Sequence, residues 1–226
     1  MSYMWTEFNI KTFPAETAVF RDGVFCPELS TLAGTDIDKK YNLPVHIIYV
    51  GEIAGKNELS INISAAGQKV FLSLRVKNKL PAFLNIFIKN TGKNSELRGH
   101  VMLENSNSLT YDCVAEHASK NTGILIKNKL LAGKNSTSVL SGVAIIDSGS
   151  VGCVSDVGFS AMADAGAKIQ FRPAQRISAV PTSADHSAAI YQGSDFQLEY
   201  LREAGLSGAE ANDALREAFM NNFPLF

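Results

Sequence analysis

The chain has 226 residues, of which 46% are hydrophobic and 19% charged, a composition typical of a globular protein rather than a disordered one. Its formal net charge of −1 gives no electrostatic footprint for nucleic acid or for an acidic membrane surface. The longest apolar runs, such as residues 45–50, are too short to span a bilayer. We therefore expect neither a nucleic-acid partner nor a membrane partner.

The amino-terminal residues and the cysteines indicate a cytoplasmic protein. The first residues lack the basic start and the apolar core of a signal peptide. Cys26, Cys113 and Cys153 are odd in number and widely spaced, which favours free thiols in a reducing compartment over a disulfide framework.

The first fifty-five or so residues form the least regular part of the chain. Residues 17–25 predict a pair of strands that turns at Arg21-Asp22-Gly23, because Asp-Gly is a strong hairpin signal. Residues 45–50 predict a buried strand, bounded by Pro44 and Gly51.

From Glu58 onward, apolar and polar residues alternate in short segments, as in half-buried strands. The segments recur every 10–15 residues or so, which is the rhythm of a sandwich, a barrel or a solenoid. The predicted strands cover residues 59–63, 70–76, 83–88, 96–104, 109–116, 123–131, 137–147, 151–160, 168–171 and 176–180.

Three features favour a solenoid: no helix interrupts the strands, the turns carry small residues, and Gly-Lys-Asn recurs at Gly55, Gly92 and Gly133. The same alternation fits a sandwich equally well, so the pattern alone leaves both open. The Gly-Lys pairs are predicted to be turns, because Asn follows each Lys and the earlier glycine of a phosphate-binding loop is missing.

The period changes near residue 194 from that of strands to that of helices. Ser194 and Ser207 each begin a segment with capping-box spacing, Gly205 is a natural left-handed stop, and Pro224 follows the last apolar position. We predict a β core over residues 1–193 and a two-helix hairpin over residues 194–226.

No constellation of catalytic residues stands out, so we do not expect an enzyme. Cys113 and His117 lie four apart on a predicted strand, about 13 Å from each other, and are interpreted as a buried thiol and a surface imidazole. Cys153 is predicted to fill the core, within a strand, and His46 and His100 are predicted to be structural. The chain has no Cys-x-x-Cys, so it does not encode a cluster site of its own.

His186 differs from the other histidines, because it sits in a polar segment where the hydrophobic period changes. From the residues alone, it is interpreted as a surface-loop histidine that bonds its own turn.

The same region contains two characteristic segments: residues 184–191 are Ala-Asp-His-Ser-Ala-Ala-Ile-Tyr, and residues 199–206 are Glu-Tyr-Leu-Arg-Glu-Ala-Gly-Leu. They resemble, respectively, the Cys-Ser-His-Gly-Ala-Thr-Val-Gly segment and the Phe-Tyr-Leu-Arg helix with its glycine stop in the SufB/SufD family of Suf-type iron–sulfur cluster assembly proteins. Residues 123–182 share the family's turns rich in Gly, Asn, Asp and Ala. The resemblance covers about the last hundred residues well, a span of normal domain size.

The resemblance implies a mainly β fold: a right-handed β-helix, a solenoid of short strands, with a C-terminal two-helix hairpin. It also implies that His186 is a metal ligand near the interface where a cluster is built, since a neutral imidazole can ligate iron. Ala184 occupies the place of the family's cysteine and cannot ligate metal. The chain is therefore similar to the supporting D-type member of the family.

The implied function is that of a non-catalytic scaffold or partner subunit, with no stably bound cofactor and only a transient iron–sulfur cluster. The β-helix would pair with a SufB/SufD-like subunit in a homo- or heterodimer, and the helices would dock an ABC-type ATPase. Amphipathic helices commonly bind in a partner's groove. The expected partner-binding residues are Leu198, Tyr200, Leu201, Leu206, Leu215 and Phe219.

Two other functions remain open from the residues. One is a carbohydrate-active β-helix enzyme, which would use exposed carboxylates such as Asp112, Glu116, Asp147 and Asp156, although these show no obvious pairing. The other is a structural interaction module without a metal or nucleotide partner.

Overall fold

The computed structural model describes residues 16–22, 24–31, 36–37, 40–180, 183–191 and 195–221. The predicted helix cap at Ser194 and the predicted stop at Pro224 lie outside these residues. None of the described helices has the length and apolar character needed to cross a membrane.

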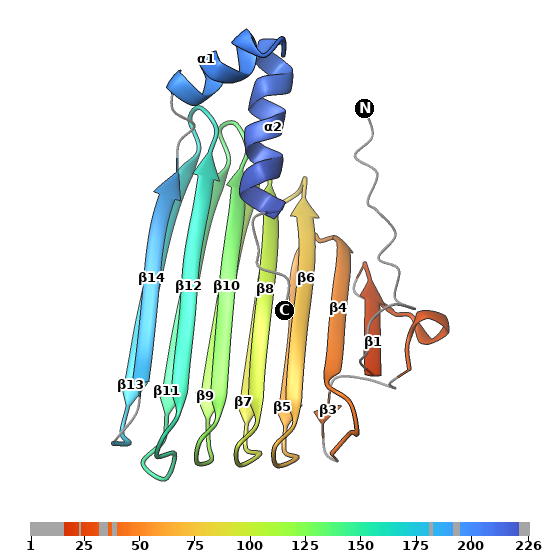
Figure 1. Cartoon of the computed structure of the whole chain (residues 1–226), viewed down its shortest axis with the longest axis vertical. Coiled ribbons are helices and arrows are strands. Elements are labelled where there is room, and N and C mark those ends of the chain that lie inside the picture. Colours follow the sequence, from red (N-terminus) through yellow and green to blue (C-terminus); the bar gives the residue numbers. More distant parts are fainter. Residues whose placement is uncertain are drawn as a thin grey trace.

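The described strands form two sheets of eight and six strands, here called sheet A and sheet B. From β4 on, consecutive strands alternate between the sheets, and from β5 on each strand pairs in parallel with the strand two places before it (Figure 1). Sheet A contains β1 (Glu16–Arg21), β2 (Val24–Phe25), β4 (Val45–Glu52), β6 (Lys69–Asn78), β8 (Glu96–Asn105), β10 (Gly123–Ala132), β12 (Val154–Ala163) and β14 (Ser183–Tyr191). Sheet B contains β3 (Asp36–Ile37), β5 (Gly55–Ile63), β7 (Ala82–Asn90), β9 (Ser108–His117), β11 (Thr137–Ile146) and β13 (Lys168–Ile177).

This winding confirms the mainly β solenoid and excludes the sandwich. One strand of each sheet makes a rung, and each rung stacks on the one before. Residues in register share their environment: Val70, Leu97 and Ile124 lie side by side on β6, β8 and β10, and all three are buried. In each strand, every second side chain points into the solenoid. These side chains are buried because the inward side chains of the neighbouring rungs cover them.

The turns between rungs confirm most of the predicted Gly-Lys-Asn turns. Asn94 and Asn135 adopt left-handed backbone conformations at φ 59°, and Asn121 does the same at φ 55°. Asn accepts this conformation more readily than other side-chain-bearing residues. The prediction at Gly55 is wrong by a few residues, since Gly55 already begins β5.

The predicted turn at Asp22 also forms. β1 and β2 pair antiparallel around Asp22, which has φ 50°. A short 3-10 helix (Pro27–Leu29) follows β2.

Two strands near the end of the solenoid differ from the sequence prediction. β13 runs unbroken through Pro173, where two shorter strands were expected. Proline is tolerated there because β13 is an edge strand, which needs hydrogen bonds on one side only. The segment around His186, interpreted as a loop, is strand β14.

The two helices confirm the predicted hairpin. α1 (Asp195–Glu203) ends at Gly205, whose φ of 97° closes a Schellman motif in which the Leu206 amide donates to the Leu201 carbonyl. α2 (Gly208–Asn221) begins with the predicted capping box: the Glu210 amide donates to Ser207 Oγ, and the Ser207 amide to Glu210 Oε2.

The core is filled around two large rings, those of Tyr111 and Phe159. Gly142 lies beneath Phe159: a Cβ at this position would come within 2.7 Å of Phe159 Cε2. The packed interior of the solenoid therefore has no space for an additional carbon atom at Gly142.

We predict that Gly142→Ala destabilises the fold by about 1–3 kcal/mol, because overpacking forces the ring of Phe159 to shift. Urea unfolding measures the change. The matched control is Gly149→Ala, at an exposed turn position where an added Cβ meets nothing within 4 Å. Equal stability of the two variants would contradict the close packing described.

Candidate functional site

The last rung, β13 and β14, is the open end of the solenoid. No described strand pairs with either one on its outer side. Several of its inward-facing residues are exposed, whereas their partners one rung earlier are buried: Ile190 is 53% exposed against 0% for Ala161, and Ile177 is 43% exposed against 1% for Ile146. This end therefore presents apolar surface that a monomer leaves in contact with water.

His186 lies on the inward-facing side of β14, in register with the buried Val157. Its side chain is nevertheless exposed, because none of the described strands forms a further rung over it. β13 and β14 are joined beside it, where Gln175 Nε2 donates to the Ala184 carbonyl at 2.9 Å. Strand β14 thus places the imidazole at the open end of the solenoid.

Iron or another metal would need more ligands than His186 alone supplies. Among the described residues, no three side chains of His, Cys, Asp or Glu gather as a potential metal site.

The helical hairpin exposes two aromatic rings on α1. Phe196 is 77% exposed and Tyr200 64% exposed. Phe196 is not among the residues expected from the sequence to bind a partner, and its exposure marks it as a second candidate contact beside Tyr200. The other expected partner-binding residues, Leu198, Leu201, Leu206, Leu215 and Phe219, are half-buried.

Phe219 anchors α2 to the solenoid. Its ring lies 5.7 Å from that of Tyr191, at the end of β14, and 5.2 Å from Lys129 Nζ on β10. Lys129 also donates to the Phe219 carbonyl, and Arg216 forms a 3.0 Å ion pair with Asp164. Figure 1 shows α2 running back along the solenoid, where it contacts β10. These contacts join α2 to β10, to the turn after β12 and to the end of β14, the strand that carries His186.

The cysteine and histidine of β9 face the interior and do not form a ligand pair. Cys113 is buried as expected, and burial raises the pKa of its thiol to about 12, so it stays protonated. The prediction of a surface imidazole at His117 is wrong: it is fully buried, and Nδ1 lies 2.8 Å from Thr122 Oγ1. Burial lowers the pKa of His117 to about 4.

Cys153, His46 and His100 are also structural, as expected. Cys153 is buried next to Ala179, although it precedes β12 instead of lying within a strand. His46 Nε2 lies 2.9 Å from Ser73 Oγ, and burial lowers the pKa of both histidines to about 4.

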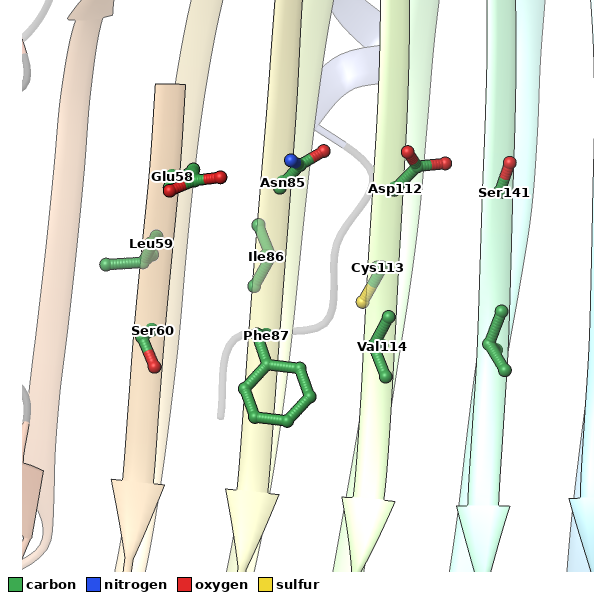
Figure 2. A pocket seen from close by; sticks show the side chains of 11 residues that line it. Glu58, Leu59, Ser60, Asn85, Ile86, Phe87, Asp112, Cys113, Val114 and Ser141 are labelled. Carbon is green, nitrogen blue, oxygen red and sulfur yellow. The ribbon is translucent and has the colours of Figure 1, made fainter. Parts of the chain in front are cut away.

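A shallow groove of about 490 Å³ crosses the outer face of sheet B. Figure 2 shows Glu58, Asn85, Asp112 and Ser141 in one row along it, on β5, β7, β9 and β11. Glu58 and Asp112 stand two strands apart, about 9.6 Å, which exceeds the roughly 5–5.5 Å of retaining glycosidases and lies at the upper limit of the roughly 6.5–9.5 Å of inverting ones. The hydrogen bond and ion pair with Lys56 lower the pKa of the Glu58 carboxyl, whereas the general acid of a glycosidase needs a raised pKa.

The other carboxylates considered for a carbohydrate-active site are dispersed. Glu116 lies about 13 Å from Asp112 along β9. Asp147 is in a turn, and Asp156 belongs to sheet A, where it pairs with Lys127. The arrangement of these acids does not favour glycoside cleavage.

The buried imidazole of His117 predicts a stability that depends on pH. Its folded pKa, about 4, lies below its ordinary value of 6.5, so the unfolded state binds the extra proton between these values. Stability should fall as the pH drops through that window. His117→Asn introduces the residue found at position 90, the neighbour of His117 in register on β7. The variant should lose less unfolding free energy than wild type between pH 7 and 4, by at most about 3 kcal/mol. Urea titrations at pH 7 and 4 test this, and identical losses in both proteins would contradict it.

The anchoring of α2 gives a second prediction. Phe219→Ala removes the contacts with Tyr191 and the Lys129 ammonium, so amide hydrogen exchange should accelerate in the last turn of α2 and at the end of β14. Tyr200→Ala is the matched control, because that ring is mostly exposed. Unchanged exchange at β14 in Phe219→Ala would mean that the hairpin is not coupled to the last rung.

The chain was compared with known proteins. No curated protein matches it. A family model described as "SUF system FeS cluster assembly, SufBD core domain" matches residues 60–219. This segment covers more than half of the chain and includes both the open rung and the helical hairpin. The chain therefore belongs to the SufBD core family of the SUF system, and has a role in iron–sulfur cluster assembly.

Proposed function

We propose that this chain is a non-catalytic partner subunit in iron–sulfur cluster assembly, which pairs with a SufB/SufD-like subunit through its open rung. The observation that carries the proposal is the exposed apolar end of the solenoid. Ile177, Val180 and Ile190 are 43%, 84% and 53% exposed there, next to two strand edges that pair with no other strand of the described part of the chain. Such an edge accepts another strand readily, and the apolar residues would supply affinity.

Pairing would place His186 at the junction of the two subunits. A neutral imidazole there would supply one ligand to a cluster under construction, which is cargo rather than a resident cofactor. Ala184 supplies none, so thiolate ligands would come from the facing subunit. A two-sided site of this kind holds its product transiently, because no single chain encloses it.

The helical hairpin would dock an ABC-type ATPase. Phe196 and Tyr200 offer the most exposed apolar area on α1, and aromatic anchors often dominate binding energy. Because Phe219 ties α2 to β14, a displacement of the hairpin by the ATPase would reach the rung that carries His186. Nucleotide-driven motion could thereby open or close the surface between the subunits.

We also place the protein in the cytoplasm. Its three cysteines are free thiols, and two of them are buried in the core. Free buried thiols suit a reducing compartment.

The test uses purified full-length protein with the ABC-type ATPase subunit and the SufB-like subunit of its own organism. Phe196→Ala with Tyr200→Ala should weaken ATPase binding by tenfold or more, about the effect of losing one aromatic anchor. His186→Ala should leave that affinity unchanged but lower cluster formation on the reconstituted complex. The proposal fails if the intact chain stays a monomer and ignores both subunits under sensitive binding conditions.

A further inference from the structure

The outer face of sheet B carries opposite charges on two strands that flank an uncharged one. On β9, Asp112 and Glu116 point outward; on β13, Arg172 and Arg176 lie in register with them, one strand beyond β11. The outward residues of β11 itself are Thr137, Val139, Ser141, Val143 and Ile145. The face therefore consists of a negative strand, a largely apolar centre and a positive strand.

Within one copy of the chain, these opposite charges do not meet. β11 separates each carboxylate from the arginine in register with it by two strand spacings, about 9.6 Å. In the described part of the chain, neither Arg172 nor Arg176 lies at ion-pair distance from a carboxylate, and Glu116 pairs with Lys89 at 2.8 Å. Both arginines are exposed, so they are available to carboxylates of another molecule.

The described helices leave this face accessible. α2 lies on the other sheet, where it contacts β10 (Figure 1). The groove of sheet B opens beside Asp112, Val114, Ser141 and Val143, and Figure 2 shows Asp112 and Ser141 in one row on neighbouring strands. The apolar centre is only half-buried, so that a second surface could remove it further from water.

We propose that two copies of this chain pack through the outer faces of sheet B, around a two-fold axis that runs along β11. Sheets that pack face to face keep their strand directions within about 30° of each other. A two-fold axis along the strands keeps the strands parallel and reverses their order in the facing copy. β9 of each copy then faces β13 of the other, and β11 faces itself.

This alignment pairs every charge named above. Asp112 of each copy meets Arg172 of the other, and Glu116 meets Arg176, which gives four contacts between opposite charges. Val139, Val143 and Ile145 meet their own counterparts on the axis. The apolar contacts would supply affinity, whereas the charges would fix the alignment.

Other alignments of the same two faces oppose like charges. An axis along β9 would place Asp112 and Glu116 each opposite its own counterpart. An axis across the strands would place β13 opposite β13 and bring Arg172 and Arg176 together. Like charges on facing surfaces cost free energy, and only the axis along β11 gives both carboxylates a cation.

The contact is separate from the pairing proposed for the open rung and does not depend on it. It uses the face of β13, whereas the addition of a strand would use its backbone edge. Three facing strands of ten residues span roughly 14 Å by 33 Å, a footprint of about 460 Å² per copy. This is smaller than the roughly 800 Å² per partner of a typical stable complex, so we expect a reversible dimer.

The experiment reverses the charges of one strand at a time in the full chain. The β13 variant carries Arg172→Glu and Arg176→Glu, the β9 variant carries Asp112→Arg and Glu116→Arg, and the exchange variant carries all four substitutions. Sedimentation equilibrium at low and high salt measures the dimerisation of each protein and of an equimolar mixture of the first two, and circular dichroism confirms folding.

The matched control carries Lys93→Glu and Lys120→Glu, which change the net charge as much as the β13 variant does, but at exposed turns. The β13 variant alters only exposed side chains, so it decides the question even if the β9 variant fails to fold.

We expect wild type and the control to form a dimer that weakens at high salt. The β13 and β9 variants should each dimerise at least about tenfold more weakly than wild type. Their mixture should regain the affinity of wild type, because each strand again faces the opposite charge. The exchange variant should dimerise by itself for the same reason, whereas pairing of β13 edges or an axis along β9 would oppose like charges in it.

Three results would overturn the inference. Wild type that stays monomeric at low salt would show that these faces do not associate. A dimer that persists unchanged in the β13 variant would show that the two copies meet elsewhere. A folded exchange variant that stays monomeric would contradict the alignment about β11. None of these results bears on the pairing of the open rung with a SufB-like subunit, which the separate binding test decides.

Discussion

The ladder of backbone hydrogen bonds between rungs is the interaction on which this structure depends. Each strand from β4 to β12 has a parallel neighbour on both sides, which satisfies its amides and carbonyls and aligns its side chains with the next layer of core. The ladder must end somewhere, and no strand of the described ranges continues it beyond β13 and β14. The exposed side chains of Ile177 and Ile190 and the imidazole of His186 lie at that end.

The hairpin adds a second constraint to the same end. A two-helix element of this length needs tertiary packing to be stable, and Phe219 obtains it from Tyr191 and Lys129. The contact joins the element proposed to bind an ATPase to the strand proposed to meet a second subunit. A distant nucleotide reaction could thus affect the cluster-building surface without any contact between nucleotide and cluster.

Much of the fold could be predicted from the sequence, because local patterns dictate it. The alternation of apolar and polar residues predicted most of the strands. The turn at Asp22 and the capping box at Ser207 are present as expected, and α1 ends at the predicted Gly205. The candidate site was harder to predict from the sequence, because its exposure depends on which rung is the last. The small and polar residues around His186 suggested a loop, and they form a strand because β12 supplies a full ladder of partners. His117 was expected at the surface, and the stacking of rungs buries it.

The most direct test of the account is amide hydrogen exchange of the full chain, alone and with the SufB-like subunit of its own organism. The account predicts that added protection concentrates in residues 168–177 and 183–191, where edge amides gain partners. Protection confined to the groove on sheet B or to another surface, with β14 exchanging as fast as in the free chain, would contradict it.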